Sequence, residues 1–226
     1  MTRSNTATPR TTPRASARRA RSTEQKHRKR QQIMVAAKEL LRDTRYESIT
    51  MGAVAERADV AKGTLYLYFE TKEVLFLGIT HNLLQTWTDD IDTELTHTTL
   101  ESLPDLLLAS LKRQPQLPAL LSILHTILEH NIPRSSALAF KLFLKNRVTC
   151  LGSSIDRHFG FLPGEGAHFL LRLHATLIGF QHMATPSSVV AGVLERPDMA
   201  LFRVDLNREL KALLPALLKL CRNQPA

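Results

Sequence analysis

The stretch that most restricts the fold of this chain is VAERADVAKGTLYLYFETKEVL, residues 54–75. Two short runs with helical apolar spacing lie on either side of a corner of small residues, 57–61. Ala55 is small enough to let a second helix approach the first. Asp59 stands where a left-handed backbone is often required, which glycine adopts most easily and Asp is among the few residues to tolerate. The stretch therefore predicts a helix-turn-helix.

The second helix of this pair, expected from about residue 62 to 69, has an unusual outward surface. A solvated helix face normally carries Glu, Lys and Gln, but here a lysine, a glycine, a threonine and two tyrosines remain once Leu65 and Phe69 face inward. Gly63 lets the backbone come near a large surface, and Tyr and Thr hydroxyls can bond phosphates or base edges. Lys72 opens the next helix, where its charge and a backbone N–H can both face a phosphate. We therefore predict that this helix lies in a DNA major groove.

The longer segment ITMGAVAERADVAKGTLYLYFETKEVL resembles the N-terminal signature of the TetR (tetracycline-repressor-like) family of transcription regulators. The resemblance covers about residues 28–77 and departs from the family pattern at Asp59, where the family usually has Gly. The matching positions are Ala58, Val60, Gly63, Thr64, Leu65, Tyr66, Tyr68, Phe69, Lys72 and Leu75. By resemblance, the DNA-contacting residues are Thr50, Lys62, Gly63, Thr64, Tyr66, Tyr68 and Lys72.

The positive charge of the chain lies at one end. Residues 1–30 hold ten Lys or Arg and one acidic residue, whereas residues 31–226 hold equal numbers of basic and acidic residues. Because residues 1–22 have no apolar side chain larger than Ala after Met1, we expect residues 1–24 to form a disordered basic arm. Such an arm attracts a polyanion, and Arg28 is the arm-proximal residue that we expect to reach DNA. The alternative is a solubilising tail.

The remaining sequence predicts helices throughout, so the expected fold class is all-α. No alternating run of β-strand length occurs, and prolines fall near the expected helix boundaries. Thr50 and Thr71 read as N-caps of helices over 51–58 and 72–95. Further helices are expected at about 101–113, 118–130, 135–159, 165–184 and 199–222, with a Pro/Ser loop before the last. We assign residues 25–72 to the helix-turn-helix domain and residues 73–226 to a larger helical domain.

The resemblance implies that the larger domain binds a ligand and forms a homodimer. The last two long helices carry apolar stripes that could pair with a second copy, although such stripes are more often core. The expected interface residues are Leu170, Leu173, Leu177, Phe180, Leu206, Leu210, Leu213 and Leu217. Candidate linings of a ligand pocket are Trp87, His125, Phe140, Phe143, Arg147 and His174, most of which could equally be core.

Several other classes of protein find no support in the sequence. No phosphate-binding loop, Gly-x-Gly-x-x-Gly or Ser-His-Asp order appears, so we expect neither enzymatic activity nor a cofactor. The His and Asp clusters lack a metal-ligand set, and we expect no metal. No apolar run approaches a membrane span. Two cysteines, Cys150 and Cys221, predict buried thiols in a cytoplasmic protein.

Together these observations predict a cytoplasmic, homodimeric transcriptional regulator that binds double-stranded DNA at a palindromic operator. A small-molecule effector would release this repressor by favouring a different separation of the two recognition helices. The alternative is a non-specific basic DNA-binding protein of the nucleoid type, whose affinity would depend steeply on salt and little on sequence.

Overall fold

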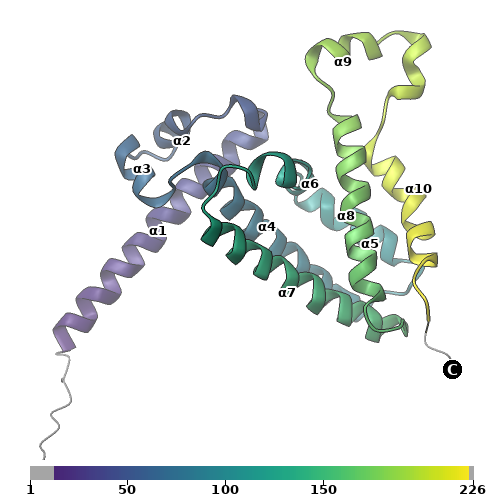
Figure 1. Ribbon diagram of the computed structural model, residues 1–226, viewed down its shortest axis with the longest axis horizontal. Coiled ribbons are helices and arrows are strands. Elements are labelled where there is room, and N and C mark those ends of the chain that lie inside the picture. Colours follow the sequence, from purple (N-terminus) through teal and green to yellow (C-terminus); the bar gives the residue numbers. More distant parts are fainter. Residues whose placement is uncertain (1–12, 224–226) are drawn as a thin grey trace, which may run out of the picture. The chain divides into compact units, whose positions relative to one another are not determined.

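The computed structural model describes residues 13–223, with side chains from residue 23 onward. The chain divides into two compact units, with the boundary between residues 68 and 69 (Figure 1). Between residues 13 and 223 the regular elements are helices, apart from one isolated bridge that pairs Phe161 with Asn223. The prediction of an all-α fold is confirmed.

The first helix of the smaller unit, α1 (Pro13–Asp43), begins earlier than expected. Residues 13–24 continue the helix, whereas the sequence predicted a disordered arm there; residues 1–12 lie outside the described residues. The helix forms because its C-terminal half is fixed by buried side chains, among them Ile33 and Ala37 at 0% exposure. Beyond that anchored half, Ala and Arg are strong helix formers, and Pro13 suits a first helical turn.

The corner of the helix-turn-helix is built by local backbone bonds. After η1 (Tyr46–Ser48), α2 (Met51–Arg57) begins at Thr50, whose hydroxyl accepts a hydrogen bond from the Ala53 N–H at 3.1 Å. Asp59 takes the left-handed conformation, with φ at 49°. The N–H groups of Asp59 and Val60 close back onto the carbonyls of Glu56 and Ala55, which is the Schellman arrangement. The predicted left-handed corner is therefore confirmed.

Two further contacts hold the short helices of this unit together. Gln32 on α1 donates a hydrogen bond from Nε2 to the carbonyl of Ala58 at 2.6 Å, which ties α1 to the end of α2. Val54 and Leu65, on α2 and on α3 (Lys62–Tyr68), are fully buried. These contacts fix the orientation of α3 within its unit.

The larger unit contains the remaining helices. Its first helix begins at the predicted residue, because Thr71 accepts the Val74 N–H at 3.2 Å as an N-cap. The elements in order are α4 (Lys72–Leu95), α5 (Leu103–Arg113), α6 (Gln116–Ser122), the π-helical turn η2 (Leu124–Leu128), α7 (Arg134–Phe159), α8 (Glu165–Ala184), α9 (Ser188–Leu194), the 3-10 segment η3 (Pro197–Phe202) and α10 (Leu206–Lys219).

Some predicted boundaries in this unit are wrong. Residues 188–194 form α9 where a loop was expected, because Ser187 accepts the Val190 N–H and caps a helix there. The last helix starts at Leu206, seven residues later than predicted, because Asp205 caps it by accepting the Arg208 N–H at 2.7 Å. Cys221 is buried as expected, but Cys150 is exposed.

Helices α7 and α8 cross in backbone contact near the start of α8. A Cβ added at Gly152 would lie 2.6 Å from the backbone nitrogen of Ala167, and one added at Gly166 would lie 2.3 Å from the Gly152 carbonyl oxygen. The buried Asp156 carboxylate accepts the N–H groups of Gly164 and Gly166 at 2.8 and 2.6 Å. This crossing is therefore fixed both by shape and by hydrogen bonds.

Among the described residues, a membrane-spanning helix would need both sufficient length and sufficient hydropathy. No single helix reaches both. The pair α8 and α9 reaches them only jointly, across a bend of 78°.

Candidate DNA-binding surface and effector cavity

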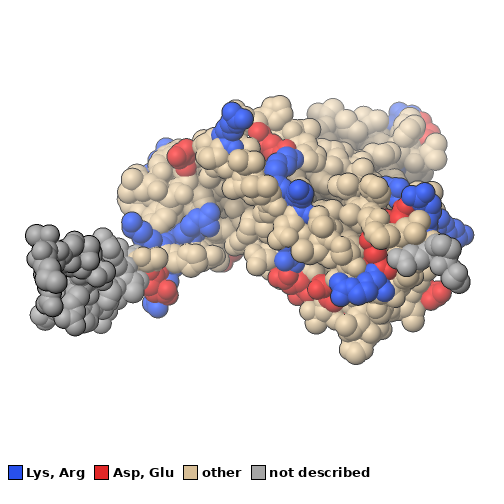
Figure 2. Space-filling view, turned by 60° about the horizontal axis from the view of Figure 1, so that its bottom comes forward, with Lys and Arg blue, Asp and Glu red and all other residues tan. Residues whose placement is uncertain are grey.

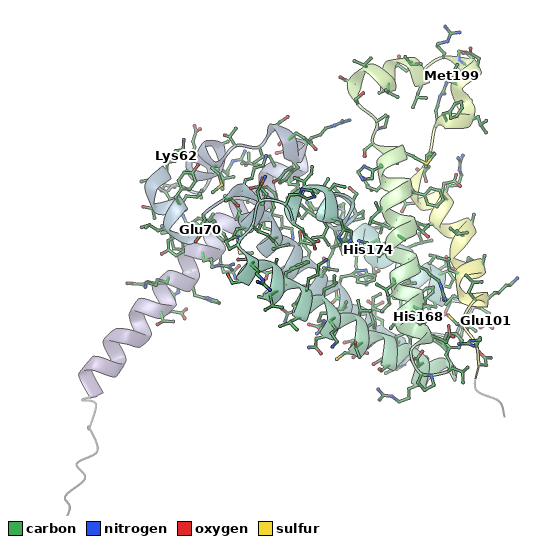
Figure 3. All side chains as sticks on the ribbon, in the orientation of Figure 1. Lys62, Glu70, Glu101, His168, His174 and Met199 are labelled. Carbon is green, nitrogen blue, oxygen red and sulfur yellow. The ribbon has the colours of Figure 1, made fainter. Side chains whose placement is uncertain are left out.

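The outward side of α3 carries most of the side chains predicted to contact DNA. Lys62 projects from the first residue of the helix and is exposed, as is Gly63, where an added Cβ would meet nothing within 4 Å (Figure 3). Tyr66 is 44% exposed, whereas Thr64 and Tyr68 are half-buried. The helix can therefore approach a surface closely at its start and present an aromatic hydroxyl one turn later.

One exposed side chain on α3 was missed by the sequence reasoning. Leu67 is 85% exposed, which is unusual for a leucine on a helix that packs its other side. Its position follows from helical phase, because the inward residues Leu65 and Phe69 lie two positions away on either side. A leucine there can contact a thymine methyl group in a major groove.

The other predicted DNA contacts lie on neighbouring elements. Thr50 is exposed, and although its hydroxyl oxygen accepts the Ala53 N–H, its proton remains available to a phosphate. Arg28 is exposed on α1 and pairs with Glu24 through Nε at 3.0 Å, an i, i+4 ion pair that costs little to break. Lys72 is the first residue of α4 and belongs to the larger unit.

A cavity of about 70 Å³ lies inside the larger unit, and leucines form most of its wall. Of the predicted pocket residues, Trp87, Arg147 and His174 line it; His174 lies on α8 (Figure 3). The wall residues are Leu84, Trp87, Thr88, Leu111, Leu117, Leu121, Leu144, Arg147, Val148, Leu170, Leu171, Leu173, His174 and Leu177. The wall of this cavity is therefore formed by side chains from α4, α5, α6, α7 and α8.

Three predicted pocket residues are not part of this wall. Phe143 stacks on His81 of α4, with ring centroids 3.7 Å apart, and Phe140 is buried beside it. Phe143 therefore packs α7 onto α4, and the ring of Phe140 supports that of Phe143. His125 lies just outside the wall, with its ring 5.4 Å from that of His174.

The polar groups of the cavity wall are mostly paired. Arg147 donates from Nε to the Thr88 hydroxyl at 2.7 Å and forms an ion pair with Asp89 through Nη2. Trp87 donates from Nε1 to the Ser110 hydroxyl at 2.8 Å. Burial lowers the pKa of His174 below its ordinary value, and the nearby His125 adds to that effect. The imidazole of His174 is therefore neutral at neutral pH.

The predicted dimer residues lie mainly inside their own unit. Leu170, Leu173 and Leu177 are at most 7% exposed, and Leu210 and Leu217 are also buried. These five side chains are covered within their own unit, because helical periodicity reveals an apolar stripe but not what covers it, and the position of the interface stays a prediction. Phe180, Leu206 and Leu213 are half-buried.

The outward face of α8 carries a second stripe with a spacing of four residues. Leu171, which also borders the cavity, and Met183 are 53% and 52% exposed, and Ala175 and Gly179 lie exposed between them. An added Cβ at Gly179 would meet nothing within 4 Å, so this face is open to another helix.

On the face shown in Figure 2, Lys and Arg side chains are interspersed with Asp and Glu side chains. This agrees with the balance of charge over residues 31–226. Among the described residues, no group of three His, Cys, Asp or Glu side chains could hold a metal ion.

Family comparisons place this architecture among known proteins. Residues 33–79 match the family "Bacterial regulatory proteins, tetR family", and residues 81–219 match "Tetracyclin repressor-like, C-terminal domain". The chain belongs to the TetR family of transcriptional regulators, which act through a DNA-binding helix-turn-helix and a helical C-terminal domain. No relative among the curated proteins matches it.

The solved structures that share this fold include two bacterial regulators. The fatty acid degradation regulator FadR from Bacillus halodurans is 20% identical, with a TM-score of 0.50 over 83% of this chain and 94% of that one. A TetR transcriptional regulator from Rhodococcus sp. RHA1 is 19% identical, with a TM-score of 0.50 over 87% of this chain and 98% of that one.

Proposed function

We propose that this protein is a cytoplasmic repressor that binds a palindromic operator as a homodimer and leaves it when a small molecule enters the cavity. The observation that carries the DNA-binding half is the outward side of α3, where Lys62, Gly63, Tyr66 and Leu67 are exposed together. The lysine can contact a phosphate, and the glycine lets the backbone approach the DNA closely. The tyrosine hydroxyl and the leucine side chain can contact base edges.

The dimer follows from the family, whose regulators are dimeric, and from the exposed stripe on α8. We propose that Leu171, Ala175, Gly179 and Met183 form the centre of the interface. Small residues in the middle of the stripe let two helices approach closely, and a two-fold axis makes the same stripe face itself. Two recognition helices then reach half-sites about 34–36 Å apart, one turn of DNA.

The effector half of the proposal depends on the size of the cavity. A cavity of about 70 Å³ is smaller than the 150 Å³ that admits benzene in an engineered protein core. A ligand of ten or more heavy atoms must therefore spread the wall, which includes Leu84 and Trp87 of α4. Because such a ligand binds the widened form better, it shifts the population toward that form.

Operator binding tests the proposal directly. We expect DNA from upstream of the gene itself to bind at least about 10³-fold more tightly than scrambled DNA at one physiological salt concentration. Tyr66→Ala should weaken specific binding while leaving the dimer intact, and Leu171→Arg should give a monomer by light scattering. A specificity ratio near one with a steep salt dependence would instead favour the nucleoid-type alternative.

A further inference from the structure

The charge of the cavity wall is already neutralised within the unit. Arg147 contributes the guanidinium of the wall, and Asp89, one position after Thr88 on α4, forms an ion pair with it. Thr88 accepts a second hydrogen bond from Arg147 Nε and donates its own proton to the Leu84 carbonyl at 2.8 Å. The guanidinium is therefore held by two neighbouring residues of α4.

His174 adds no positive charge to this wall. It is hydrogen-bonded to the backbone of Leu121, and burial lowers its pKa, so the neutral form predominates at neutral pH. Its Nε2 is buried without a hydrogen-bond partner. Lys141, whose charge acts on His174, is paired with Glu129 at 2.8 Å. An anion that entered would find no unpaired cation among these groups.

We propose that the effector is an uncharged, mainly apolar molecule, and that Asp89 sets this specificity by holding Arg147. This inference rests on the proposed function of the cavity. A carboxylate ligand would lose its hydration against a wall of leucines and would compete with Asp89 for Arg147. An alcohol of the same length avoids both costs.

Trp87 provides the measurement, because it is the single tryptophan of the chain and lines the cavity. We would titrate the full chain with 1-octanol and with octanoate at pH 7.5 and follow tryptophan fluorescence. We expect octanol to bind at least about tenfold more tightly. Asp89→Asn should improve octanoate binding at least about tenfold, because it frees the guanidinium. The matched control, Asp92→Asn, makes the same change of charge on the exposed side of α4.

Three outcomes would overturn the inference: octanoate binding to the unmodified protein as tightly as octanol, no fluorescence response to either probe up to its solubility, or equal effects of Asp89→Asn and Asp92→Asn. The proposed function is judged separately. A protein that binds its operator specifically and is released by octanoate keeps that function and refutes the uncharged effector.

A second, independent observation concerns the segment between α8 and α10, residues 185–205, which we call the connecting arm. Neither α9 nor η3 within it contains a buried residue, and η3, where Met199 is labelled, projects beyond the ends of α8 and α10 (Figures 1 and 3). Its exposed large apolar side chains are Val189, Val190, Val193, Leu201 and Phe202, from 46% to 86% exposed.

The connecting arm is ordered by polar contacts although it lacks a core. Arg203 donates from Nε to the Leu194 carbonyl at 2.5 Å and from Nη2 to the carbonyls of Glu195 and Arg196. Arg196 forms a two-bond ion pair with Asp198 at 3.0 and 2.8 Å. The apolar side chains are therefore held out on a preformed scaffold, which lowers the entropy lost when they are covered.

We further infer that a second copy of this chain covers the connecting arm. The arm begins two residues after Met183, the last residue of the exposed stripe of α8, so a copy packed on that stripe lies next to the start of the arm. A four-residue stripe alone falls short of the roughly 800 Å² per partner of a stable interface, and the five arm residues add several hundred Å². A membrane is the weaker occupant, because five charged side chains lie within the arm: Glu195, Arg196, Asp198, Arg203 and Asp205.

Sedimentation equilibrium tests this second inference. We expect Val193→Asp with Leu201→Asp to raise the dimer dissociation constant at least about tenfold with unchanged circular dichroism. The control Leu142→Asp alters a leucine of α7 that is 57% exposed and lies outside the arm. An unchanged dissociation constant refutes the inference, as does binding of the unmodified chain to lipid vesicles that the double variant abolishes. If Leu171→Arg still gives a monomer, the proposed dimer stands without the arm.

Discussion

Replacing Asp59 by Gly should stabilise the DNA-binding unit, because the corner of the helix-turn-helix holds a side chain in the left-handed conformation. The φ of 49° costs an L-residue about 1.5 kcal/mol, the middle of the range of about 1–2 kcal/mol for a left-handed backbone. Glycine removes this cost, but it also has more conformational freedom in the unfolded chain. That freedom lowers the gain in folding stability by about 0.4–1 kcal/mol. The net gain should be about 0.5–1 kcal/mol.

Amide hydrogen exchange is the suitable assay, since it reports on this unit separately from the larger one. The N–H of Val60, bonded to the Ala55 carbonyl at 3.0 Å, and that of Leu65, bonded to the Ala61 carbonyl at 3.1 Å, should exchange about two- to fivefold more slowly in Asp59→Gly. Asp59→Ala keeps a Cβ in the same backbone and should exchange no more slowly than the unmodified chain. Unchanged or faster exchange in Asp59→Gly would show that the corner is not strained.

Three further predictions concern the larger unit. Asp156→Ala should lower the free energy of unfolding by about 2–4 kcal/mol in urea, because two N–H groups at the start of α8 lose their acceptor, and Asp156→Asn, which keeps one acceptor, should lose less. Gly152→Ala should cost about 1–3 kcal/mol, since its Cβ would meet the Ala167 backbone at 2.6 Å; an unchanged urea midpoint would rule out a rigid crossing. Because the pKa of His174 is lowered from 6.5 by folding, the unfolded chain binds more protons, and stability should fall as the pH drops below about 6.5. His174→Gln should flatten the change in urea midpoint between pH 7 and 5.5, and an equal slope would contradict the buried neutral imidazole.

The local features of the DNA-binding unit could be predicted from sequence because each depends on neighbours in the chain. Thr50 and Thr71 cap the helices that follow them, and Asp59 adopts the left-handed conformation, as their residue types indicate. The surface of α3 follows from helical phase once Leu65 is known to be buried. The roles of the individual residues on DNA remain predictions.

The larger unit was harder to predict because its features depend on contacts between distant segments. Periodicity finds the apolar stripe of α8, but only the packing shows that Leu170 and Leu177 face a cavity within the unit. Nor does the sequence reveal that Arg147 and Asp89, 58 positions apart, neutralise each other. The π-helical turn η2 likewise has no local signature that we could use.

The close crossing of α7 and α8 gives α7 a fixed pivot. The backbones touch at Gly152, so no side chain can yield there, and widening of the cavity must rotate α7 about that point. Arg147 lies five residues from the pivot, about 7.5 Å along the helix, and Arg134 lies about 27 Å from it. A displacement of ~0.5 Å at the cavity then becomes ~1.8 Å at Arg134. Three residues before Arg134, the Asn131 carbonyl accepts the hydroxyl proton of Thr71, which is the N-cap of α4. The largest displacement of α7 therefore occurs next to the start of α4, the helix that follows the recognition helix α3.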